Sequence, residues 1–191
     1  MKSRGARRFI AIIGAAVSIT AMFGIAPAAA EERVCRGTLT GITVDNLRVP
    51  DDATCTLTRV LVKGTAKVES DATLIVNNSR VIGNVQGEDA SRLVVRRGSR
   101  VGGSVQFVQG GAARVVNSDV NGDVQYDDNN RKLAVLGNEV GGSVQVMQNT
   151  GGVVIRDNTI DGNLQCKENV PAPTGGNNTV DGNKEDQCKS L

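Results

Sequence analysis

Short apolar runs recur along the chain at a nearly constant interval, and turn-forming residues separate them. The most regular run reads Val-x-Gly-x-Val-Gln or a close variant. Its central glycine is found at Gly83, Gly103, Gly122, Gly142 and Gly162, with a decayed copy at Gly182 and a weaker one around Gly64. Because successive glycines are 19 or 20 residues apart, the chain contains an internal repeat of the length that solenoid proteins use.

A second apolar run precedes each glycine phrase. These runs cover residues 74–76, 93–95, 113–115, 133–135 and 153–155, and Gly, Asn, Ser or Asp follows each of them. In residues 101–106, the two valines and the central glycine fall on one face and Gln106 on the other, which is the two-residue period of a β-strand. Helices are disfavoured because Gly and β-branched residues are frequent.

The predicted fold class is all-β: a single-stranded parallel β-helix, or solenoid, with about 20 residues per turn. Such a turn provides three short strands and three bends, and seven turns stacked about 4.8 Å apart would form a rod roughly 30 Å long. Left-handed hexapeptide helices use about 18 residues per turn, so the longer turn favours a right-handed coil. Leucine-rich repeats fit less well because Val dominates, and the calcium-binding Gly-Gly-x-Gly-x-Asp motif does not occur in the sequence.

Equivalent residues of stacked turns should form rows along the rod. One outward row comprises Gln86, Gln106, Gln125, Gln145 and Gln165. A second row, at a bend, comprises Asn78, Asn117, Asn138 and Asn158. Stacked amide side chains hydrogen-bond to one another, so both rows are interpreted as stabilising ladders. The outward Gln row is also a candidate polar strip for a periodic ligand.

The four cysteines lie near the two ends of the repeat region. Cys35 and Cys55 are 20 residues apart, and Cys166 and Cys188 are 22 apart. Each interval is close to one turn, whereas cross-pairing would exceed the reach of a disulfide. We therefore predict the disulfides Cys35–Cys55 and Cys166–Cys188, each worth roughly 3 kcal/mol in the chain-entropy model. Such cysteine usage indicates an oxidising compartment, and free reactive thiols are the alternative.

The C-terminal stretch 166–191 departs from the repeat. Pro171 and Pro173 interrupt strand pairing, and residues 184–186 (Lys-Glu-Asp) place charge where an inward Val is expected. We interpret this stretch as a polar cap that opposes end-to-end stacking, which favours a monomer.

Residues 1–30 have the organisation of a secretory signal peptide. Basic residues precede an uncharged apolar run over residues 9–25, and Ala28-Ala29-Ala30 supplies a cleavage site. A membrane anchor is the alternative, for which the run is short. The chain is thus divided into a signal peptide (1–30), an N-terminal cap and first turn (31–56), the β-helix repeats (57–165) and a C-terminal cap (166–191). The predicted location is extracellular, either free or associated with the cell wall.

Removal of the signal peptide changes the charge. The whole chain has 22 Lys+Arg and 20 Asp+Glu, and the four basic residues of the signal leave 18 against 20. The predicted product has no overall positive charge to attract nucleic acid. It also has no second apolar run that could span a membrane.

Several segments resemble a family of small secreted bacterial β-helix repeat proteins of unknown function. These segments are Val34-Cys35-Arg36-Gly37-Thr38, residues 44–50, and the closing residues 165–169 and 186–188. The resemblance covers nearly the whole chain after residue 30 and implies no activity. The Val-x-Gly-x-Val phrase also resembles the bactofilin type of polymer-forming β-helix, whose members are cytosolic and lack the cysteines at the ends.

The residue inventory excludes several kinds of catalytic site. The chain has no His, which rules out Ser-His-Asp and Cys-His nucleophilic sites and most zinc sites. Pectate-lyase-like enzymes are parallel β-helices that use carboxylates, a cation and a basic residue. One hypothesis therefore places a cation at Asp127 and Asp128 with Arg131 as the base. The competing interpretation is an ordinary Asp- and Asn-rich turn.

Ligand binding without catalysis is the other hypothesis. Phe107 and Tyr126 occupy one register on neighbouring turns, where they would either stack on a sugar ring or form an internal aromatic pair. With Asp127, Asp128 and the Gln row they form the candidate ligand face. An ice-binding face would need a flat Thr row, which the repeat does not supply. The sequence favours a secreted, non-catalytic structural or cell-surface protein that binds a polysaccharide or cell-wall polymer and needs no metal or cofactor. The alternative is a pectate-lyase-like enzyme.

Overall fold

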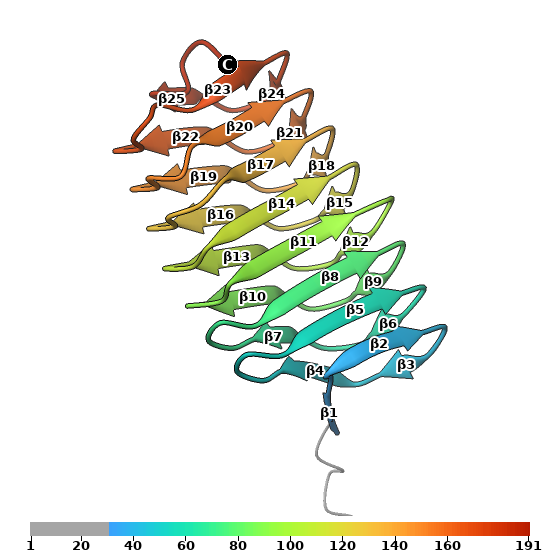
Figure 1. Cartoon of the computed structure of the whole chain (residues 1–191). Coiled ribbons are helices and arrows are strands. Elements are labelled where there is room, and N and C mark those ends of the chain that lie inside the picture. The colour runs from blue at the N-terminus through green and yellow to red at the C-terminus, as the bar shows by residue number, and fades with distance from the viewer. Residues whose placement is uncertain (1–30) are drawn as a thin grey trace, which may run out of the picture.

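The computed structural model of the protein describes residues 31–191, so the predicted signal peptide lies outside the described residues. The described chain forms three parallel β-sheets that wind into one solenoid (Figure 1). Residues 31–191 contain no helix, and so none that is long and apolar enough to cross a membrane. The prediction of an all-β parallel solenoid is confirmed.

Each turn contributes one strand to each of three sheets, here named A, B and C. Sheet A has nine strands: β1 (Glu32–Val34), β4 (Asn46–Val49), β7 (Ala66–Val68), β10 (Val85–Glu88), β13 (Val105–Val108), β16 (Val124–Asp127), β19 (Val144–Met147), β22 (Leu164–Lys167) and β25 (Lys184–Asp186). Sheet B has eight: β2 (Gly37–Thr40), β5 (Thr54–Thr58), β8 (Thr73–Asn77), β11 (Arg92–Arg96), β14 (Ala112–Val116), β17 (Leu133–Leu136), β20 (Val153–Arg156) and β23 (Thr174–Gly176). Sheet C has eight: β3 (Thr43–Val44), β6 (Leu61–Val62), β9 (Arg80–Val81), β12 (Arg100–Val101), β15 (Asp119–Val120), β18 (Glu139–Val140), β21 (Thr159–Ile160) and β24 (Thr179–Val180).

The solenoid has eight turns rather than the seven predicted, because sheets B and C each contain eight strands. The first turn, formed by β2, β3 and β4, lies within the predicted N-terminal segment 31–56. It lacks the marker glycine, and Asp45 takes that place: its carbonyl accepts the Gly64 N–H, just as the Gly64 carbonyl accepts the Gly83 N–H. Of the described chain, only residues 31–34 lie below this corner rather than a complete turn, and the backbone of Glu31 hydrogen-bonds to the Asp45 side chain.

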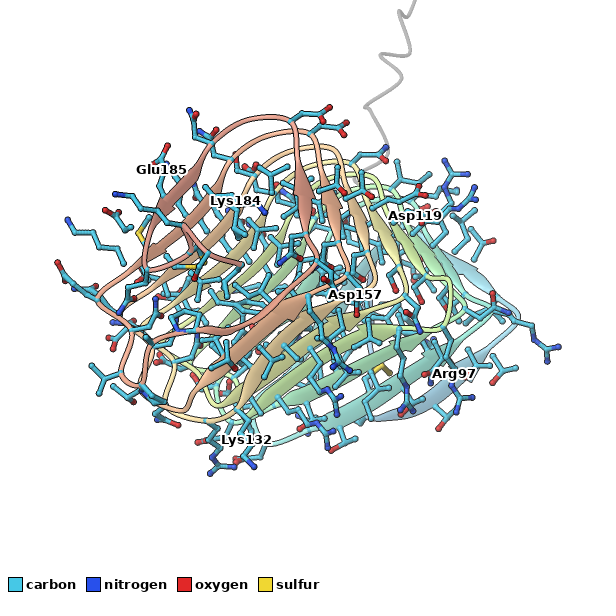
Figure 2. The ribbon with its side chains drawn as sticks, turned by 90° about the horizontal axis from the view of Figure 1, so that it is seen from above. Arg97, Asp119, Lys132, Asp157, Lys184 and Glu185 are labelled. Atoms are coloured by element: carbon cyan, nitrogen blue, oxygen red, sulfur yellow. A yellow bond between two sulfur atoms is a disulfide. The ribbon has the colours of Figure 1, made fainter. Side chains whose placement is uncertain are left out.

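The coil is right-handed, as its turn length predicts. In Figure 1 the turns rise from the N-terminal β1 to the C-terminal β25, with sheet B in front. In Figure 2, seen from above, Lys132 marks where a sheet B strand begins, and Asp157 marks the corner where the sheet B strand of the following turn ends. Lys184 and Glu185 of sheet A lie on the far side, so the chain turns anticlockwise as it rises toward the viewer.

The Val-x-Gly-x-Val phrase crosses a corner of the coil. Val101 ends β12 in sheet C, Val105 begins β13 in sheet A, and Gly103 lies in the bend between them. The prediction of one continuous strand here is therefore wrong, although both valines are buried in the core. Glycine is needed at this corner because successive turns approach closely. A Cβ atom on Gly83 would lie only 2.7 Å from the carbonyl oxygen of Gly64.

The interior is filled by the inward residues of all three sheets, which are mostly Val, Leu and Ile. Phe107 and Tyr126 are the largest of these buried side chains. Two glycines make room for the Phe107 ring. A Cβ atom on Gly87 would lie 3.0 Å from Phe107 Cδ2, and one on Gly110 would lie 2.5 Å from Phe107 Cζ. Gly87 and Gly110 thus leave the space that the Phe107 ring occupies.

A buried polar ladder lies at the corner between sheets B and C. Its members are Ser79, Ser99, Ser118, Asn138, Asn158 and Asn178. Asn158 Oδ1 accepts the backbone N–H and the Nδ2 of Asn138, both at 3.0 Å, and Asn158 Nδ2 donates to the Val135 carbonyl at 2.9 Å. The predicted Asn row is therefore confirmed at these two positions. It is wrong at Asn78 and Asn117, which are exposed bend residues with φ of 43° and 47°, a left-handed conformation that Asn tolerates.

A second buried ladder, at the corner between sheets A and B, is not among the predicted rows. It comprises Asn129, Asn149, Asn169 and Gln187, linked through Nδ2–Oδ1 bonds of 2.9 Å and a final bond to Gln187 Oε1 at 3.0 Å. Earlier turns have small residues in this register, Ala72, Ala90 and Gly110. Because the row begins only half-way along the rod, the repeat did not reveal it.

Both predicted disulfides are present. Cys35 and Cys55 join adjacent turns with their Cα atoms 5.6 Å apart, and Cys166 and Cys188 do so at 5.3 Å. At the C-terminal end, Leu191 is buried against the core and closes it. Lys184 occupies the register of the buried Leu164. A charged residue therefore replaces an apolar one in the last turn, as the sequence predicts.

Candidate functional site

The predicted Gln row lies on the outer face of sheet A and forms a continuous hydrogen-bonded chain. The Nε2 atoms of Gln86, Gln106, Gln125 and Gln145 each donate to the Oε1 of the next Gln, at 2.7, 2.7, 2.8 and 3.1 Å. Gln165 completes the chain by donating to Glu185 at 2.8 Å. Each amide is half-buried and already has a partner within the row. The row is thus a stabilising ladder whose remaining hydrogen-bonding capacity faces outward.

A shallow depression lies beside the first part of this ladder. It has a volume of about 360 Å³ and is bordered by Lys67, Gln86, Glu88 and Gln106. Basic, acidic and amide groups share its rim, so no single ligand charge is favoured there.

The side chains of Phe107 and Tyr126 are buried in the core. They are 0 % and 1 % exposed, so a role in stacking on a sugar ring is wrong and the internal aromatic pair is correct. Their positions are equivalent in β13 and β16, and the third residue of each sheet A strand from β7 to β22 points inward. The Tyr126 hydroxyl donates to the Ala134 carbonyl at 3.3 Å. Complete burial raises the pKa of Tyr126 far above its usual range.

Asp127 and Asp128 separate at the end of β16. Asp127 is a half-buried outward residue of sheet A, whereas Asp128 is exposed in the bend with φ of 52°. None of the ion pairs within residues 31–191 joins either carboxylate to Arg131. In the same part of the chain no group of three or more His, Cys, Asp or Glu residues converges as metal ligands would. The geometry that the lyase hypothesis needs is not assembled around these residues.

Asp128 instead belongs to a column of bend residues with positive φ. The column comprises Asp52, Asp71, Asp89, Gln109, Asp128, Gln148, Glu168 and Asp186. Asp is among the residues that enter this backbone region most readily, so the acidic character of the column follows from the bend. It forms an acidic border between sheets A and B.

The outer face of sheet B carries features that the repeat did not reveal. Its first strands present Thr in register: Thr38 beside Thr56, Thr40 beside Thr58, and Thr54 beside Thr73. Thr rows therefore do exist, contrary to expectation, although each extends over two turns only. Further along the rod the same positions are occupied by Arg and aliphatic residues. Because the residue type changes from turn to turn within each row, the outward positions of sheet B do not appear as a repeat in the sequence.

Charge is distributed unevenly between the sheets. The eight strands of sheet B contain four Arg (Arg92, Arg96, Arg114 and Arg156) and no Asp or Glu. The nine strands of sheet A contain five acidic and five basic residues. Lys132, immediately before β17, adds a further cation on the side of sheet B (Figure 2). The net charge of the chain is therefore close to zero although the outer face of sheet B is positively charged.

No protein-family model, no curated protein and no solved structure matches this chain. The assignment to a β-solenoid thus depends on the sheet topology and register alone.

Proposed function

We propose that the protein is a secreted, non-catalytic solenoid that binds an extracellular polymer, such as a polysaccharide or cell-wall polymer, along its length. Two disulfides fit an oxidising compartment outside the cell. The resemblance to small secreted bacterial repeat proteins agrees with this location, and the cell wall is the nearest polymer that such a protein would meet.

The observation that carries the proposal is the register of the outward side chains. Eight strands spaced about 4.8 Å apart give faces roughly 34 Å long, on which side chains recur once per turn. Parallel pairing of successive turns fixes the backbone beneath each outward row, so little backbone entropy is lost on binding. A rigid surface with a constant repeat suits a ligand that is itself a linear repeat.

The proposal is tested by co-sedimentation of the oxidised protein, residues 31–191, with insoluble bacterial cell walls, cellulose and chitin. Silica beads serve as the matrix without sugar. We expect saturable retention on at least one polymer and release by a soluble glycan of the same chemistry. Retention on no polymer, or equal retention on silica, contradicts the proposal. Release of unsaturated sugar fragments from a polymer would instead establish the lyase.

A further inference from the structure

We infer that the outer face of sheet B is the ligand-binding surface and that its ligand is an anionic polysaccharide aligned with the rod axis. This inference deepens the proposed function and rests on it. The binding surface is then distinct from the Gln row, which is a ladder, and from the aromatic pair, which is buried.

The cations of this face are placed on consecutive turns. Arg92 and Arg96 lie in β11, Arg114 lies in β14, Lys132 directly precedes β17, and Arg156 ends β20. At about 4.8 Å per turn, four turns present positive charge over roughly 14 Å of the axis. A linear polymer with an acid group on each repeat can contact several of these cations at once.

Most of these cations have no carboxylate partner. Among residues 31–191, the ion pairs include Arg156 with Asp157 at 3.6 Å but none to Arg92, Arg114 or Lys132. These three side chains are exposed. Guanidinium groups bind carboxylate, sulfate and phosphate oxygens through charge-assisted hydrogen bonds. The strands of sheet B contain no Asp or Glu, so a polyanion bound at Arg92, Arg114 and Lys132 would not have to displace an ion pair from these three side chains.

The acidic column limits where a polyanion can lie. Asp89 and Asp128 stand at the border between sheets A and B, beside the first positions of the sheet B strands. An anionic chain that lies perpendicular to the strands, and so passes from turn to turn, stays on the cationic face. An anionic chain that lies parallel to a single strand would meet the acidic border. The charge pattern therefore favours a ligand parallel to the rod axis.

The apolar residues between the cations form a floor rather than a protruding patch. Val94 and Ala134 point outward yet are only 4 % and 7 % exposed. Arg114 lies between them in the same row, where the aliphatic part of its side chain can cover both. Val154, the next residue of that row, is 38 % exposed. Such a floor can contact the C–H faces of sugar rings but offers little to insert into a membrane.

A polysaccharide fits better than a nucleic acid. Binding of single-stranded nucleic acid depends on exposed aromatic residues that stack on bases, and both aromatic residues of the described chain are buried. The large hydrophobic residues exposed within residues 31–191 are Val and Ile only.

The test compares two charge-matched triple variants. The first, Arg92→Gln, Arg114→Gln and Lys132→Gln, removes three cations from sheet B. The control, Arg33→Gln, Lys67→Gln and Lys189→Gln, removes three exposed cations elsewhere. Affinity is measured by calorimetry for polygalacturonate, for its neutral methyl ester, and for dextran sulfate. Anionic phospholipid vesicles and duplex DNA complete the panel, and urea midpoints verify that both variants are folded.

We expect the protein to bind polygalacturonate or dextran sulfate about 10-fold or more tightly than the methyl ester, with affinity falling as salt is added. The sheet B variant should bind about 10- to 100-fold more weakly, and the control within about 3-fold of the parent protein. Preference for the carboxylate or the sulfate polymer identifies the source of the negative charge.

Different results contradict different parts of the account. Equal losses in the two variants, or binding to the methyl ester as tight as to the acid, would overturn the assignment to sheet B while polymer binding itself stands. Preferential binding to vesicles or DNA would overturn the ligand class. Failure to bind any soluble or insoluble polysaccharide would contradict the proposed function as well.

Discussion

Replacement of Asn149 by Ala should strongly destabilise the solenoid. The side chain is fully buried and connects three turns. Its Oδ1 accepts the backbone N–H and the Nδ2 of Asn129, both at 2.9 Å. Its Nδ2 donates to the Tyr126 carbonyl at 3.0 Å and to Asn169 Oδ1 at 2.9 Å. Alanine can make none of these bonds.

The magnitude follows from the groups that lose their partner. Truncation leaves the Asn129 N–H and the Tyr126 carbonyl buried without a side-chain partner, and each such group costs about 1–3 kcal/mol. We therefore expect a loss of roughly 2–6 kcal/mol in the free energy of unfolding, toward the lower end if a water molecule occupies the vacated space. This is a large fraction of the stability of a domain of this size.

The matched control is Asn130→Ala. Asn130 is exposed, and no side-chain hydrogen bond to it is present among residues 31–191, so its truncation should change stability by less than about 0.5 kcal/mol. Urea unfolding of the oxidised proteins, followed by far-UV circular dichroism, measures both. If Asn149→Ala unfolds at the same urea concentration as Asn130→Ala, the ladder does not stabilise the corner and the reasoning is refuted.

Three further predictions concern the core and the ends. Gly110→Ala should cost about 1–3 kcal/mol through overpacking against the Phe107 ring and the Ala90 carbonyl. Phe107→Leu in the same chain should recover the part of that loss that is due to the ring in urea unfolding; no recovery would contradict the role given to the ring. Burial raises the pKa of Tyr126, so the folded state retains the phenol proton at a pH where the unfolded chain loses it. Stability should therefore be constant with respect to this group below about pH 10 and fall above it, and the fall should be smaller in Tyr126→Phe; identical pH profiles would count against it. Replacing Cys35 and Cys55 together by Ser should lower stability by roughly 3 kcal/mol, and thermal unfolding that matches the parent would show that the N-terminal turn does not need its disulfide.

The repeat architecture could be predicted because glycine and valine recur wherever the same geometry recurs. Gly83 stands at a corner where the turns touch, so every later turn must repeat it. The disulfide pairing followed from the same period, since residues one turn apart are neighbours. The first turn lacks the marker glycine because, within the described chain, the corner at Asp45 lies above residues 31–34 only, not above the corner of a complete turn.

The binding surface was harder to predict because surface rows are free to vary. The row Ile75, Val94, Arg114, Ala134 and Val154 is in register, yet no two adjacent turns carry the same residue type in it. Period-two alternation, continued from Val105 and the outward Gln106, places Phe107 on the inward side, as the structure shows. The same register places Tyr126 inward.

Calorimetric titration with size-defined oligogalacturonides shows whether an anionic polymer lies along sheet B. If a linear anionic polymer lies along sheet B, affinity should rise with each added sugar until the ligand spans the roughly 14 Å occupied by the cations, and then level off. A single galacturonate that binds as tightly as the longer chains, or a series in which none binds, would contradict the account.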